Sequence, residues 1–107
     1  MTGLSAADAE GFFWLGYRFF WQKKIEDAYV YVEAATQLSD QDARFWYYRS
    51  LCEKNLGMDR QAAASLRQAV DLHVKGMPRQ DLIGQALERV QGEDRMQLRE
   101  ALDARRA

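Results

Sequence analysis

The chain of 107 residues has the length of one compact domain. Its 15 Lys and Arg residues nearly balance its 16 Asp and Glu residues, so it lacks the positive excess of a general nucleic-acid binder. One Cys and one His exclude an internal disulfide, a Cys-based zinc site and most His-rich metal sites. We therefore expect one domain over residues 1–107 that binds no nucleic acid, no metal and no cofactor.

The first ten residues contain neither a basic stretch nor an apolar run, so they are not typical of a secretory signal. The most apolar stretch, residues 12–21, contains Arg18 and has half of the roughly 20 residues that span a bilayer. We expect a cytoplasmic protein that makes no use of a membrane. The free thiol of Cys52 is compatible with a reducing compartment.

Apolar residues at helical spacing predict helices along the whole chain. Two antiparallel helix pairs are expected within residues 11–38 and 45–72. Pro78 favours a helix start, and the stripe that follows predicts a helix over residues 78–90. A turn at residues 91–92 then precedes a closing helix. The chain is therefore expected to be all-α, with about six helices.

The two helix pairs match each other at an offset of 34 residues. The matched positions are Phe12/Trp46, Gly16/Ser50, Ala28/Ala62, Val32/Leu66, Ala35/Ala69 and Leu38/Leu72. This pattern resembles the tetratricopeptide repeat (TPR) family. The family has a 34-residue period, with an aromatic residue, then Leu-Gly, a second aromatic residue, and later two alanines on either side of an apolar residue. The second copy departs from this pattern at Arg49 and Glu53, where the family has an apolar residue and an aromatic.

The resemblance implies a short right-handed superhelical array of about three TPR-like helix hairpins. Their expected repeats cover residues 9–42, 43–76 and 77–104. The third repeat is divergent, because Glu100 and Asp103 stand where apolar residues are expected. We interpret it as a hairpin that caps the array, and we expect residues 9–104 to form a complete short array.

In the TPR family the first helix of each hairpin lines a concave groove. The resemblance therefore assigns partner contacts to ten residues of the first two repeats. These are Phe13, Trp14, Tyr17, Phe20, Trp21, Arg44, Tyr47, Tyr48, Leu51 and Lys54. The segment over residues 12–21 is apolar nearly all round, which is more than one packing stripe needs. Apolar side chains beyond one packing stripe indicate an interaction surface, although these aromatic rings could also pack within a small core.

The predicted function is a non-enzymatic protein–protein interaction module or chaperone-like adaptor. An apolar or amphipathic peptide segment would bind the aromatic groove, with Arg44 and Lys54 setting its direction. In outline this is similar to small TPR-type bacterial secretion chaperones. The alternative is a structural subunit that forms a homodimer through the same aromatic surface.

No motif predicts an enzyme. The chain has no glycine-rich phosphate loop, and Cys52 has no His near it in sequence. Glu26-Asp27 and Glu93-Asp94 are typical of the first turn of a helix rather than of paired catalytic carboxylates. The fold class and the class of function are thus predicted, and the identity of the partner is left open.

Overall fold

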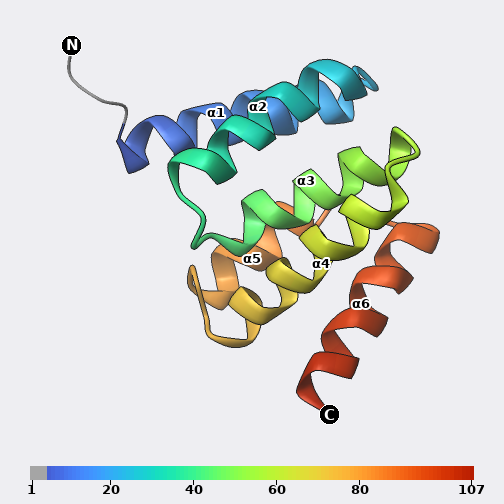
Figure 1. The fold of residues 1–107 in the computed structure, drawn as a ribbon. Helices are drawn as coiled ribbons and strands as arrows, with labels where there is room; N and C mark the ends of the chain where they lie inside the picture. Colours follow the sequence, from blue (N-terminus) through green and yellow to red (C-terminus); the bar gives the residue numbers. More distant parts are fainter. Residues whose placement is uncertain (1–4) are drawn as a thin grey trace.

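The computed structural model describes residues 5–107, which form six α-helices and no strand (Figure 1). The all-α expectation is confirmed. The helices are α1 (Ala6–Trp21), α2 (Ile25–Leu38), α3 (Ala43–Asn55), α4 (Asp59–Val74), α5 (Gln80–Leu87) and α6 (Gly92–Arg106).

Helices α1 and α2 form one hairpin, and α3 and α4 form a second that lies beside it (Figure 1). The same turn closes both hairpins, 34 residues apart. Lys23 and Gly57 both have a left-handed backbone, with φ of 67° and 77°. In each turn the next amide donates to the carbonyl five residues back, Lys24 to Phe19 at 2.9 Å and the equivalent bond of the second hairpin at 2.8 Å. A left-handed conformation strains Lys23 but suits a glycine.

The two helices of the first hairpin approach closely at Gly16. A Cβ atom at Gly16 would lie 2.6 Å from Cγ1 of Val32 and 3.1 Å from the carbonyl oxygen of Ala28. Val32 and Ala28 are fully buried. At the equivalent place in the second hairpin, the Ser50 hydroxyl donates to the Ala62 carbonyl at 2.8 Å. Small residues at these positions therefore allow the close contact within each hairpin.

Arg49 and Glu53, the two residues that depart from the TPR pattern, form a largely buried polar network between α2, α3 and α4. The fully buried Glu53 carboxylate accepts hydrogen bonds from Ser65 Oγ at 2.6 Å, the Tyr29 hydroxyl at 2.9 Å and Arg49 Nε at 3.1 Å. Arg49 also donates to Thr36 Oγ1 at 2.8 Å. Burial and the hydrogen bond to Glu53 raise the pKa of Tyr29 to about 12. A buried charge is tolerated here because every part of the carboxylate has a partner.

The third pair of helices does not repeat this arrangement. Helix α5 packs on α3, whereas α6 packs on α4, and α5 and α6 are not paired along their lengths. Helix α5 ends at Leu87, before the expected Val90. The left-handed glycine at this end of the repeat is Gly92, the first residue of α6, with a φ of 63°; it stands one position later than the 34-residue period requires. The expected third hairpin, divergent and capping, is therefore not confirmed: a short α5 on α3 and a separate α6 on α4 stand in its place.

We expect Gly16→Ala to lower the free energy of unfolding by about 1–3 kcal/mol, because the added methyl overpacks the contact with Val32. Gly11→Ala is the matched control. Gly11 lies in the same helix with open space around it, so the change should stabilise the fold by about 0.5–1 kcal/mol through helix propensity. Chemical denaturation measures both values. Equal effects of the two substitutions would contradict the close approach of α1 and α2.

Candidate protein-interaction surface

Tyr48 of α3 lies at the centre of the contact between α1, α3 and α5. Its ring is fully buried, with centroid distances of 5.6 Å to Phe13, 5.5 Å to Phe20 and 6.4 Å to Trp21. Its hydroxyl donates to the Ala86 carbonyl in α5 and accepts a hydrogen bond from Trp21 Nε1 at 3.2 Å. Helix α5 thus covers the face of α1 and α3 on which the groove was expected.

The structure buries most of the expected groove residues. Six of the ten side chains are buried: Phe13, Phe20, Arg44, Tyr47, Tyr48 and Leu51. They form the protein's own core, which corrects the expectation that they line an open groove. Lys54 is half-buried and donates to Asp94 and Gln97, both at 2.8 Å. Three aromatic side chains among the ten predicted groove residues remain accessible to solvent: Trp14 is exposed, and Tyr17 and Trp21 are half-buried.

Arg44 joins the first turns of α1 and α3. Its guanidinium donates to both oxygens of Glu10, at 2.6 and 3.0 Å, and to both oxygens of Asp42, at 2.7 and 3.0 Å. The charge lies 5.4 Å from the Phe13 ring centroid and 5.5 Å from that of Phe45. Partial burial opposes ionisation of Glu10, but hydrogen bonds from Arg44 and Trp14 outweigh it and lower the pKa of the carboxyl group. These four hydrogen bonds engage the Arg44 guanidinium within the protein and tie α3 to α1.

The accessible aromatic row consists of Trp14, Tyr17 and Trp21. Ring centroids are 5.1 Å apart between Trp14 and Tyr17 and 6.3 Å apart between Tyr17 and Trp21. The Arg89 guanidinium, in the connection between α5 and α6, lies 4.8 Å from the Trp21 ring. The row borders an open hollow of about 410 Å³ whose other lining residues are Arg18, Gln22 and Arg89. Trp14 keeps 42% of its surface exposed.

Of the two arginines of this hollow, Arg89 stands at a position that the TPR resemblance assigns to the groove, whereas Arg18 was not a predicted contact. Arg18 follows Trp14 by four positions and precedes Trp21 by three, so helical spacing alone places it beside the row. Arg89 reaches the row from the connection between α5 and α6, 68 positions after Trp21 in the chain.

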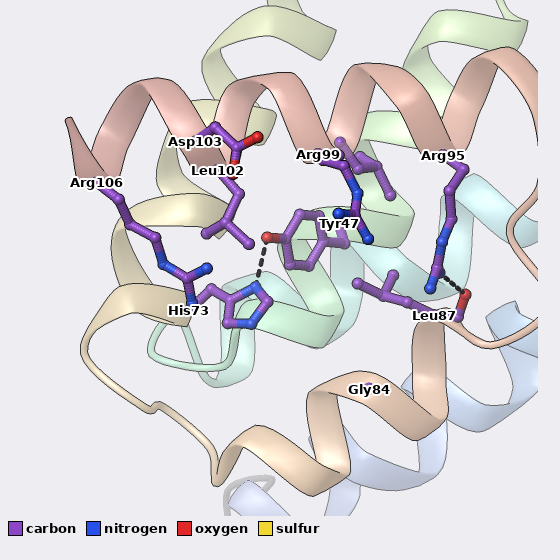
Figure 2. Close-up of a pocket in the computed structure, with 10 residues that line it drawn as sticks. Tyr47, His73, Gly84, Leu87, Arg95, Arg99, Leu102, Asp103 and Arg106 are labelled. Carbon is purple, nitrogen blue, oxygen red and sulfur yellow. Dashed lines mark hydrogen bonds between the residues drawn. The ribbon is translucent and has the colours of Figure 1, made fainter.

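A second hollow lies between α5 and α6 (Figure 2). It has a volume of about 230 Å³ and is bordered by apolar side chains of α5 and α6 and by three arginines of α6. At one end the Tyr47 hydroxyl and His73 Nδ1 form a hydrogen bond of 2.7 Å. Burial raises the pKa of Tyr47 and lowers the pKa of His73, so both side chains are uncharged at neutral pH. Tyr47, expected in the peptide groove, belongs instead to this cavity.

The remaining sequence features contribute no reactive group. Burial raises the pKa of the Cys52 thiol to about 12, so the thiolate that would act as a nucleophile is scarce at neutral pH. Within residues 5–107 no cluster of three metal-ligating side chains occurs. None of the described helices is both long and apolar enough to pass through a bilayer.

Comparisons with family models, curated proteins and solved structures find no match for this chain. The described structure offers two candidate sites, the hollow beside the aromatic row on α1 and the cavity beside α6.

We expect Tyr48→Phe to lower the free energy of unfolding by about 1–3 kcal/mol. The change leaves the Trp21 Nε1 donor and the Ala86 carbonyl without their buried partner. Tyr31→Phe is the control, because the half-buried Tyr31 stacks on Phe19 but its hydroxyl has no hydrogen bond among the described residues. Thermal and chemical denaturation compare the two variants. A Tyr48→Phe variant as stable as Tyr31→Phe would contradict the role of the hydroxyl.

The lowered pKa of His73 predicts a pH-dependent stability. In the unfolded chain His73 binds a proton more readily than in the folded protein, so acid favours unfolding. We expect the free energy of unfolding to fall as the pH drops from 7.5 through the ordinary His range near 6.5 toward the lowered folded pKa. The lowered carboxyl pKa values of Glu10 and Asp71 act in the same direction at more acidic pH. The His73→Gln substitution should remove the fall in the free energy of unfolding that occurs above about pH 5. If this fall persists in the variant, groups other than His73 cause it.

Proposed function

We propose that the chain is a non-enzymatic protein–protein interaction module that binds an amphipathic peptide segment of another protein. The observation that carries this proposal is the aromatic row of Trp14, Tyr17 and Trp21, which remains accessible beside a hollow of about 410 Å³. Trp, Tyr and Arg dominate the residues that supply binding energy in protein interfaces. All three types meet at this hollow.

A TPR-like origin of the scaffold is supported by two features that recur after 34 residues. One is the left-handed turn at Lys23 and Gly57, and the other is the close contact of Gly16 and Ser50 with the partner helix. In this proposal the first two hairpins form a short superhelical array, and α5 and α6 close it. The module would act as a cytoplasmic, chaperone-like adaptor without a cofactor.

The charges around the aromatic row specify the partner further. Arg18 and Arg89 border the hollow, and none of its described lining residues is acidic. An acidic amphipathic segment matches this surface, with its apolar side chains on the rings and its carboxylates on the arginines. Burial of the rings would supply most of the affinity, and the arginines would set orientation and the rate of association. In this role Arg18 and Arg89 take the place of Arg44 and Lys54.

A peptide-display selection against the immobilised protein tests the proposal. We expect enrichment of peptides that combine apolar and acidic residues and that lose at least about tenfold in affinity for a Trp14→Ser variant. Val30→Ser is the matched control, because Val30 is 62% exposed on α2 and does not line the hollow. Circular dichroism should show equal helicity in all three proteins. Failure to enrich such peptides, or equal binding by Trp14→Ser, would contradict the proposal.

Light scattering over a hundredfold range of concentration tests self-association through the same row. We expect the molar mass of one chain at all concentrations. A dimer that dissociates in the Trp14→Ser variant would assign the row to a homodimer interface and replace the peptide-binding proposal.

A further inference from the structure

The cavity between α5 and α6 exists because these helices do not pack against each other. Helix α6 is attached to α4, where Leu98 is buried and Arg105 donates to Asp71 at 2.8 and 3.1 Å. On the facing side, α5 presents Gly84, and a Cβ atom there would meet nothing within 4 Å. The open space of about 230 Å³ is thus a consequence of the helix arrangement.

Unpaired positive charge borders this cavity. Arg95, Arg99 and Arg106 line it from α6, and Figure 2 shows their guanidinium groups extending from that helix toward α5 and His73. Arg95 donates to the Leu87 carbonyl at 2.7 Å. Arg99 and Arg106 form neither an ion pair nor a side-chain hydrogen bond within residues 5–107. Asp103 is the one acidic residue of the lining, against three arginines.

The neighbouring Arg105, in contrast, has an acidic partner outside the cavity. Its guanidinium is paired with Asp71, which also binds Lys75 at 3.0 Å on the outer side of α4. Adjacent arginines of one helix therefore differ: Arg105 has an acidic partner and Arg106 has none.

The rest of the lining is uncharged and largely apolar. Leu87 and Leu98 are buried, Leu102 is half-buried, and the Tyr47 ring lies between the arginines (Figure 2). Tyr47 and His73 add hydrogen-bonding groups without negative charge. A cavity of about 150 Å³ holds a benzene ring, so one of this size accommodates a ring together with a carboxylate.

We propose that this cavity binds a small organic acid, with its carboxylate on Arg99 and Arg106 and its apolar body against Leu87, Leu98 and Leu102. Charge-assisted hydrogen bonds from arginine suit a carboxylate, and the leucines select an aromatic or branched body over a purely polar anion. The cavity shares no lining residue with the hollow beside the aromatic row. The two proposals are therefore independent, and each can be tested without the other.

Titration of the protein with phenylacetate, followed by NMR of the leucine methyl groups, tests the site. We expect saturable shifts at Leu87, Leu98 and Leu102. The neutral analogue phenylacetamide should bind at least about tenfold more weakly, because it lacks the charge that the arginines recognise. Absence of saturable shifts, or equal affinity for the two compounds, would overturn the proposal. Tighter binding of N-acetylphenylalanine than of phenylacetate would overturn the small-acid assignment in favour of a peptide C-terminus.

Four variants locate the binding. Arg106→Gln should weaken phenylacetate binding about tenfold, whereas the adjacent Arg105→Gln should leave it unchanged. Gly84→Leu should fill the cavity and abolish binding, whereas Gly11→Leu, at another helical glycine with open surroundings, should not. Methyl spectra of the free variants establish that each is folded. Equal binding by Gly84→Leu and Gly11→Leu, or by Arg106→Gln and Arg105→Gln, would place the ligand elsewhere and overturn the site.

Discussion

The hydrogen bond from the Tyr48 hydroxyl to the Ala86 carbonyl is the constraint on which the arrangement of the molecule depends. Tyr48 is fully buried, so its hydroxyl must find partners inside the protein. Ala86 supplies an acceptor in α5, and Trp21 supplies a donor in α1. Satisfying this one group holds three helices together and brings α5 across the aromatic face of α1 and α3. An open groove on that face is incompatible with the same contacts.

The interior also contains ionised groups, and each is surrounded by partners. Arg44 bridges Glu10 and Asp42 beside two phenylalanine rings. The Glu53 carboxylate accepts hydrogen bonds from side chains of three helices, α2, α3 and α4. Among the described residues, no buried side-chain nitrogen or oxygen lacks a hydrogen-bond partner. Buried charged networks of this kind favour one register of neighbouring helices, because a shifted helix would leave a charge unpaired. Residues that depart from the repeat pattern thus serve the packing between hairpins.

The position of α5 separates the two surfaces for which we propose binding. Helix α5 covers the centre of the aromatic face, whereas the row of Trp14, Tyr17 and Trp21 at its edge stays in contact with solvent. Because α5 lies on α3 while α6 lies on α4, a second hollow opens between them (Figure 1). One displaced helix therefore accounts for both the loss of the expected groove and the presence of an unexpected cavity.

The sequence by itself determined the helical class, the two hairpins and their 34-residue repeat. These features depend on residues close together in the chain: the apolar spacing of each helix, the turns at Lys23 and Gly57, and the small residues Gly16 and Ser50. Only the tertiary structure decided which apolar surface is covered. The helical spacing of apolar residues predicts that Phe13 and Tyr48 are shielded from water. It does not determine whether a partner or another part of the chain covers them. The contacts of Tyr48 with Ala86, of Arg44 with Glu10 and of Arg89 with Trp21 join residues 34 to 68 positions apart, and no local pattern encodes them.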